Sequence, residues 1–357
     1  MLEPRALHPG AWWVWALGLA VAASRTTNPL LLALVLAVAG FVVVSRRGDA
    51  PWALAFRVYA WVAGVIVLSR VLFRILIGGE DGGHVLFTLP AIPLPAAAAG
   101  IELLGPTSAE ELLGGFYDGL RLATIVLCVG AANALANPKR LLKAVPGALA
   151  EVSTAVTVAL SVAPQLVESV QRVRRARRLR AARGRGLRFL RGIFVPVLAD
   201  AMDRSLQLAA AMDSRGYGRR GHLERRVRVV IAVCVPAGFA GVAVGIYGVL
   251  DGSAGWLGVP MLVAGLVVAG AGFVLGGRRI RRTTYRPDPW RLPETLVALC
   301  GVLACALVLV ASPASLETPV SPPSWPTLPV LPAVAVLIAV LPAWLAPRPA
   351  PLVEVAK

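Results

Sequence analysis

Long apolar runs, separated by short polar stretches, make up most of the sequence. A run of about 18 to 20 apolar residues is long enough to cross the hydrocarbon core of a bilayer as an α-helix. Hydrophobic residues make up 57% of the chain and charged residues only 15%. The pattern therefore predicts an all-α, polytopic helical membrane protein with about eight spans, at residues 11–23, 30–44, 52–77, 112–136, 229–250, 256–275, 296–311 and 328–345.

One long polar stretch, residues 168–228, interrupts this pattern. It holds seventeen arginines, five acidic residues and no lysine, and so carries +12 of the chain's net charge of +17. Such a segment is not expected to lie in lipid, because charges inside a bilayer are costly. We therefore divide the chain into N-terminal transmembrane helices (1–150), a cytoplasmic region (151–228) and C-terminal transmembrane helices (229–357).

The basic residues also predict the orientation of the chain, because loops rich in Lys and Arg stay in the cytoplasm. The basic loops are 46–51, 137–150, 168–228 and 278–291, and they alternate with loops that carry little positive charge. This alternation fits eight spans with both termini cytoplasmic, in the cell (plasma) membrane, provided that 151–167 does not cross. Whether 151–167 inserts into the membrane stays open.

Two amphipathic helices are predicted within the polar stretch. Apolar positions recur at three- and four-residue spacing, which is typical of a helix with one apolar face. The first helix carries ten arginines between Arg172 and Arg191, and its small apolar face comprises Val167, Val170, Val173, Ala176, Leu179 and Ala182. The second begins after Pro196, with an apolar face of Val197, Leu198, Ala201, Met202, Ser205, Leu208, Ala209 and Met212, and with Asp200, Asp203 and Arg204 opposite.

The second helix is expected to end at residues 214–218. Gly216 or Gly218 can supply the left-handed residue that commonly closes a helix, which leaves Arg215 at the tip. Three functions fit an arginine-rich region of this kind. It could touch anionic lipid headgroups, neutralise nucleic-acid phosphates, or dock on a soluble partner. Few aromatic residues interleave with the arginines, so nucleic acid is not expected as a partner.

The segment from Leu208 to Gly218, LAAAMDSRGYG, resembles a signature of the transmembrane (T) component of energy-coupling factor transporters, which are ABC importers. That family includes the cobalt/nickel uptake permease subunit. Residues 24–29, 137–142 and 285–290 are similar to further landmarks of the family, so the resemblance covers nearly the whole chain. It implies that residues 151–228 form a pair of arginine-tipped coupling helices.

The resemblance also implies partners and site residues. Arg215, with Ser214 and Gly216, would dock on one ABC-type ATPase subunit, and Leu208, Ala209 and Met212 would pack on a small membrane S component that binds a vitamin or a transition-metal ion. The first docking tripeptide departs from the usual form. Matching the letters selects Ala182-Arg183-Gly184, whereas counting from Pro164 selects Arg180, and both alternatives stay open.

No catalytic centre is predicted. The sequence lacks the glycine-rich phosphate loop ending in Lys-Ser/Thr that an ATPase needs, and His8, His84 and His222 are scattered. We expect no cofactor and no resident metal, and we interpret Cys128, Cys234, Cys300 and Cys305 as buried apolar residues. The competing interpretation is a membrane-bound enzyme, or a scaffold, that uses the basic cytoplasmic surface to hold an anionic lipid or nucleotide.

Overall fold

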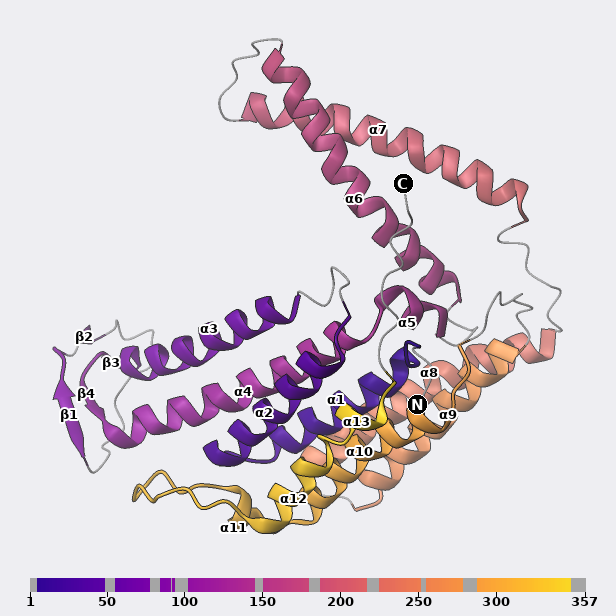
Figure 1. Cartoon of the computed structure of the whole chain (residues 1–357). Helices are drawn as coiled ribbons and strands as arrows, with labels where there is room; N and C mark the ends of the chain where they lie inside the picture. Colours follow the sequence, from indigo (N-terminus) through magenta and orange to yellow (C-terminus); the bar gives the residue numbers. More distant parts are fainter. Residues whose placement is uncertain are drawn as a thin grey trace. The chain divides into compact units, whose positions relative to one another are not determined.

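Most of the residues that the structure describes are helical. The computed structural model describes residues 5–48, 55–77, 84–90, 92–93, 102–144, 150–179, 187–216, 225–251, 255–278 and 288–347 (Figure 1). The chain divides into two compact units. Unit 1 comprises Met1–Leu141 and Asp288–Lys357, and unit 2, which is inserted into it, comprises Leu142–Pro287.

Unit 1 is built from the first helices of the chain and the last ones. In chain order these are α1 (Pro9–Ser24), α2 (Pro29–Arg46), α3 (Ala55–Leu76), α4 (Ala109–Leu135), α10 (Leu292–Val310), α11 (Pro313–Leu316), α12 (Val330–Ile338) and α13 (Pro342–Leu345). Helix α5 (Pro138–Ala144) begins in unit 1, shortly before the first segment of this unit ends at Leu141. Two antiparallel strand pairs connect α3 to α4: β1 (Val85–Thr88) with β4 (Pro106–Ser108), and β2 (Ile92–Pro93) with β3 (Glu102–Leu103). The sequence did not predict these short strands.

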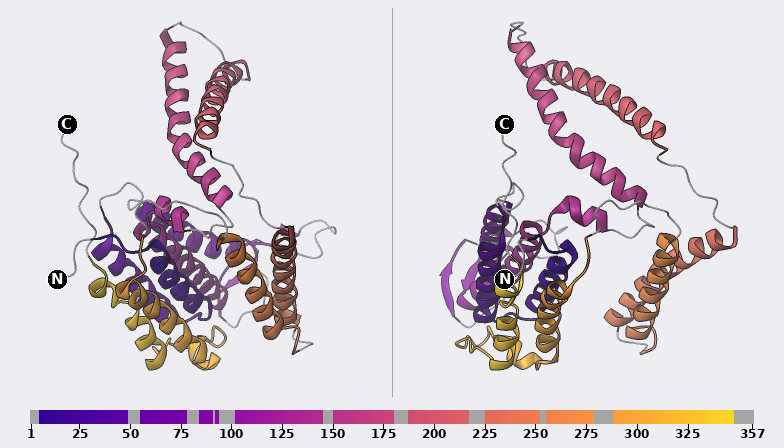
Figure 2. Two further views of the ribbon diagram at one scale, coloured as in Figure 1. Left: turned by 90° about the vertical axis from the view of Figure 1, so that its right-hand side faces the viewer. Right: turned by 45° about the vertical axis from the view of Figure 1, so that its right-hand side comes forward.

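The core of unit 1 lies around α1. Its Trp15 and Leu19 are fully buried, and the indole Nε1 of Trp15 donates to the carbonyl of Ala339, 3.0 Å away. Helices α1 and α10 cross in near-backbone contact, because a Cβ atom built on Gly18 would lie 2.3 Å from the carbonyl oxygen of Gly301. Helix α1 thus buries most of its surface but leaves Val14, Leu17 and Val21 exposed, whereas much of the apolar surface of α3 is exposed. Figures 1 and 2 show the course of both helices.

The corner between α1 and α2 is held by the chain near α11. Asn28 caps α2 by accepting from the amides of Leu30 and Leu31, and its Nδ2 donates to the carbonyl of Thr327 at 2.6 Å. The hydroxyl of Thr26 donates to the carbonyl of Leu316, also at 2.6 Å. This polar corner was one of the landmarks of the sequence resemblance, and its bonds give it a role in stabilising unit 1.

Unit 2 contains α6 (Ala150–Leu179), α7 (Leu187–Ser214), α8 (Arg225–Asp251) and α9 (Val259–Arg278). Helices α8 and α9 pack as an antiparallel pair with a seam of glycines. A Cβ atom on Gly245 would lie 2.4 Å from the amide nitrogen of Leu262, and one on Gly238 would lie 2.4 Å from that of Ala269. Small residues that let backbones approach this closely are typical of helix pairs in membranes.

The described residues include seven helices that are long and apolar enough to cross a membrane, which confirms the predicted polytopic all-α class. Six of them coincide with predicted spans. The predicted first and last spans are shorter than 18 residues, since α1 has 16 and the last apolar stretch is Val330–Leu345. The seventh candidate is Val152–Leu179, which meets the same length and composition criteria. Whether it crosses stays a prediction from the charge pattern.

Candidate functional site

Helices α6 and α7 form the part of unit 2 that contains the predicted site (Figure 2). They pack antiparallel, and three pairs of facing residues keep one register over about three turns. Arg177 lies opposite Gly192, Ser169 opposite Asp200, and Gln165 opposite Arg204. A Cβ atom on Gly192 would lie 1.5 Å from the guanidinium of Arg177, so only glycine leaves room for this arginine in its present place.

Asp200 is the centre of the contact between the two helices. Its carboxylate accepts from the hydroxyl of Ser169 at 2.6 Å and from Nε of Arg204 at 3.2 Å, and the guanidinium of Arg172 lies 3.8 Å away. These interactions, the Ser169 hydrogen bond first, lower the pKa of Asp200 below its usual value, because each favours the ionised carboxylate. Arg204 also donates to Oε1 of Gln165 at 3.4 Å and thereby joins both helices.

The polar side of α7 therefore faces α6, and the predicted apolar face is largely exposed. Ile193 is buried and Val197 half-buried at the contact. On the other side, 47% of Leu198 and 61% of Met202 are exposed, and nearer the end of the helix 38% of Leu208 is exposed. Ala209 is exposed and Met212 half-buried. Of the predicted apolar face of α6, Val170 and Val173 are half-buried, but 57% of Val167 and 89% of Leu179 are exposed.

The structure corrects two helix boundaries. Helix α7 begins at Leu187 and continues through Pro196, whereas the sequence analysis started this helix after the proline. Residues 187–191 consequently belong to α7 and not to the first arginine-rich helix. Residues 151–167 are the first half of α6 and continue without a break into the arginine-rich half, through Pro164. Proline removes one hydrogen bond of a helix and bends it, but packing can override this preference.

The tip of α7 has the predicted form. The helix ends at Ser214, exposed Arg215 follows, and Gly216 has φ of 74°. The amide of Gly216 donates to the carbonyl of Asp213 at 2.9 Å, and that of Arg215 to Met212 at 3.2 Å. The positive φ is favourable only for glycine among ordinary residues, so Gly216 fixes how the backbone leaves the helix. The hydroxyl of Ser214 turns back to the carbonyl of Ala211, 2.9 Å away.

The other predicted docking residues, Arg180, Ala182, Arg183 and Gly184, lie outside the described residues, and so does Gly218. Helix α6 is described as far as Leu179, and five of residues 172–178 are arginines. Positive side chains are favourable at the C-terminal end of a helix because they oppose its dipole. The choice between Arg180 and Arg183 thus stays open.

The described residues contain no group of three or more His, Cys, Asp or Glu side chains that could hold a metal ion. His84 lies 2.9 Å from the Glu110 carboxylate, which ties the first residue before β1 to the start of α4. Cys128 and Cys300 are buried and Cys234 and Cys305 half-buried, all with free thiols. His222 lies outside the described residues.

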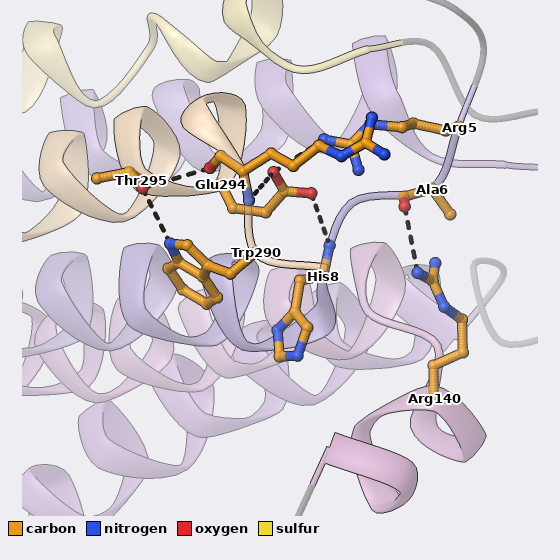
Figure 3. Close-up of polar contacts among 8 residues, drawn as sticks. Arg5, Ala6, His8, Arg140, Trp290, Glu294 and Thr295 are labelled. Atoms are coloured by element: carbon orange, nitrogen blue, oxygen red, sulfur yellow. Dashed lines mark hydrogen bonds and ion pairs between the residues drawn. The ribbon is translucent and has the colours of Figure 1, made fainter. Parts of the chain in front are cut away.

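Two other segments from the sequence resemblance meet in unit 1. Nε of Arg140, from 137–142, donates to the carboxylate of Asp288, from 285–290, at 2.8 Å, and its NH2 donates to the carbonyl of Ala6 at 3.2 Å. Nearby, the fully buried carboxylate of Glu294 accepts from Arg5 at 2.9 Å and from the amide of His8 at 3.4 Å (Figure 3). Residues 285–287 lie outside the described residues.

Residues 4–225 match the cobalt transport protein family, CbiQ. The chain belongs to this family. The match covers α1 to α7 and includes Arg215 and both candidates for the first docking arginine, Arg180 and Arg183, and it confirms the resemblance drawn from the sequence. No curated protein matches the chain. With seven apolar helices of spanning length among its described residues, the protein is a multi-pass membrane component of the cobalt transport family.

Sequence reasoning missed Ser169 and Asp200 as a pair that joins the helices of this CbiQ-family protein. Both residues are polar and lie in a region where polar residues are expected at the surface. One signal was present, since Asp200 and Arg204 stand four residues apart on the face opposite the apolar one. The sequence analysis placed this face opposite the apolar one without a partner, whereas Asp200 and Arg204 contact α6.

Proposed function

We propose that this chain is the transmembrane coupling subunit, or T component, of an energy-coupling factor type ABC importer. In this role it transmits conformational change from two ABC-type ATPase subunits to a small substrate-binding S component. The cargo would be a transition-metal ion or a vitamin, and membership of the cobalt transport family favours cobalt. The subunit itself would not catalyse a reaction, and it would need no cofactor.

One observation carries the proposal. Arg215 is exposed directly after the last residue of a 28-residue helix, on a backbone whose direction is set by Gly216. A guanidinium is a planar group of five donors that suits carboxylates and backbone carbonyls in a groove. A helix end at which the backbone direction is fixed and an arginine is exposed is therefore well suited to dock on a soluble partner.

The length of α7 supports two separate docking points. The first candidate tip, Arg180 or Arg183, precedes α7, and Arg215 follows it. The 28 residues of α7 correspond to about 42 Å at 1.5 Å per residue. Two positions that far apart fit two ATPase subunits better than one. Closing of the ATPases would then move the two tips relative to each other.

The exposed apolar face of α7 supplies a surface for the third partner. Leu198 and Met202 lie exposed on the side that does not contact α6, and Leu208 is exposed nearer the end of the helix. Methionine and other apolar side chains on one helical face are typical of helices that lie in an apolar groove. We propose that Leu208, Ala209 and Met212 pack on the S component, so that rotation of α7 is passed to it as a rigid-body movement.

We propose the plasma membrane as the location, with both termini and the α6–α7 pair on the cytoplasmic side. The basic loops favour this orientation by the positive-inside rule, and it requires that 151–167 stays on the cytoplasmic face. The remaining arginines would steer the basic region toward acidic surfaces of the ATPases and toward anionic lipids, but not toward nucleic acid.

The test is co-purification from the native host with a tagged full-length chain. Arg215→Lys keeps the charge and loses the planar fork, and Arg215→Ala loses both. Both changes should lower the amount of ATPase that copurifies and the uptake of radiolabelled Co²⁺. Arg191→Lys, at an exposed arginine on the same helix, is the matched control and should change neither. Undiminished ATPase recovery in both Arg215 variants would contradict the proposal.

A further inference from the structure

The two chain connections of unit 2 are tied together by an ion pair. Unit 2 begins at Leu142 and ends at Pro287. Arg140 lies two residues before its start and Asp288 directly after its end, and the two side chains meet at 2.8 Å although 148 positions separate them in the sequence. We call residues 137–140 and 288–291 the neck. Both of its segments belong to unit 1.

Each segment of the neck is also fixed to the rest of unit 1. On the entry side, NH2 of Arg140 donates to the carbonyl of Ala6 at 3.2 Å. On the exit side, the ring of Trp290 lies 5.2 Å from that of His8, and its Nε1 donates to the hydroxyl of Thr295 at 2.9 Å (Figure 3). The amide of Arg291 donates to the buried carboxylate of Glu294 at 3.1 Å.

One short N-terminal segment, residues 5–8, contacts both segments of the neck. Glu294 is 0% exposed and binds Arg5 and the amide of His8, so this segment is held by a buried charge. Removing a partner from a buried carboxylate is strongly destabilising. The interactions with Glu294 therefore fix residues 5–8 to the start of α10. Arg140 thus binds this N-terminal segment, through Ala6, and the exit segment of the neck, through Asp288.

The Arg140–Asp288 pair is not suited to stabilise the fold as a whole. Its side chains are 23% and 34% exposed, and pairs in contact with solvent contribute little to stability. Its position is its distinguishing property, because it joins the two covalent connections between unit 2 and unit 1. These connections are the path along the chain by which a movement of unit 2 can act on unit 1.

We propose that Arg140 is a positioning residue for transport, which holds the two segments of the neck together while unit 2 moves. The proposal rests on the proposed coupling function. With the neck closed, a movement imposed at the tips of α6 and α7 acts on unit 1 at one place. Without the ion pair, the entry and exit segments can move independently of each other, and part of the movement of unit 2 is then not transmitted to unit 1. Arg140 therefore contributes to the Co²⁺ taken up per ATP hydrolysed.

The experiment measures this ratio in the complex purified from the native host and reconstituted in vesicles. Arg140→Ala and Asp288→Ala should each lower Co²⁺ uptake per ATP by about threefold, the factor that a pair of this exposure contributes to an equilibrium. The charge exchange, Arg140→Asp with Asp288→Arg, should restore much of the ratio. Arg47→Ala, at an exposed arginine of unit 1 on the same predicted side, is the control and should leave it unchanged.

The outcomes separate this proposal from the coupling function. If Arg215→Ala loses the ATPases and Arg140→Ala keeps both the ATPases and the ratio, the neck proposal is wrong and the coupling function stands. If Arg140→Ala lowers only the yield of complex, with an unchanged ratio, the pair is structural and the neck proposal is again wrong. If Arg215→Ala keeps the ATPases, the coupling function fails first. A lowered ratio that the charge exchange restores supports the neck proposal.

Discussion

The hydroxyl of Ser169 on α6 donates to the carboxylate of Asp200 on α7 across 2.6 Å, and this bond is the centre of the contact between the two helices. Arg204 and Arg172 surround the same carboxylate. A hydrogen bond to an ionised group is shorter and stronger than one between neutral groups. The relative position of α6 and α7 thus depends on polar partners, while the apolar side of α7 remains available.

Removal of the Asp200 charge should loosen the helix pair. In Asp200→Asn the carboxylate interactions with Arg172 and Arg204 are lost, and we expect faster hydrogen exchange of backbone amides near Ser169 and Arg204. Hydrogen-exchange mass spectrometry of the full chain in nanodiscs measures this. Asp213→Asn, at an exposed acid on the same helix, is the control. Equal protection in Asp200→Asn and in the unaltered chain would contradict the assigned contact.

The contact should resist mild acid. The pKa of Asp200 is lowered from its ordinary value of 3.8. Its contribution to the stability of the α6–α7 contact is therefore fully present above that value and is lost only as the pH falls through the lowered pKa. Spin labels on α6 and α7 should therefore report one distance from neutral pH to pH 5 and a broader distribution well below 3.8. A change centred between pH 5 and 7 would assign control of the contact to another group.

Gly216→Ala should impair the presentation of Arg215 with little effect on the rest of the fold. A φ of 74° costs a Cβ-bearing residue about 1 kcal/mol or more. We expect weaker ATPase recovery and an unchanged melting temperature of the purified chain. Asparagine tolerates this conformation better than alanine, so Gly216→Asn should retain more recovery. Equal recovery in both variants would show that the left-handed turn is unimportant for docking.

The glycine seam of α8 and α9 makes a separate prediction about stability. Gly245→Ala places a Cβ atom 2.4 Å from the backbone of Leu262, and overpacking of this kind costs about 1 to 3 kcal/mol. Gly270→Ala on α9 is the matched control, since a Cβ atom there has no neighbour within 4 Å. The first variant should melt at a lower temperature in detergent and the second should not. Equal melting temperatures would contradict the packing of this helix pair.

Hydrophobic periodicity was sufficient to predict most spans, because burial in lipid or protein requires long apolar helices. It could not predict how α7 packs, since the Asp200 contact depends on three polar side chains from two helices. It misplaced the start of α7 for a related reason. Pro196 signals a helix boundary locally, yet Ile193 is buried against α6 and keeps the preceding turns helical.

The tip at Arg215 was predictable because a left-handed glycine after a helix is a local feature, encoded within a few residues. The Arg140–Asp288 pair was not predictable, since nothing in the sequence connects positions so far apart. Both segments had been noted for their resemblance to family landmarks. Their meeting in unit 1 gives a physical reason for considering them together.

The proposed coupling function depends on contact between Arg215 and an ATPase subunit, and site-specific photo-crosslinking detects such a contact. A photoreactive phenylalanine analogue would replace Arg215 in the tagged full-length chain in its native host, and Arg191 in the control. The account predicts an ultraviolet-dependent adduct with an ABC-type ATPase subunit at position 215 and none at position 191. Adducts at position 215 with lipid alone, in a complex that still contains the ATPases, would contradict it.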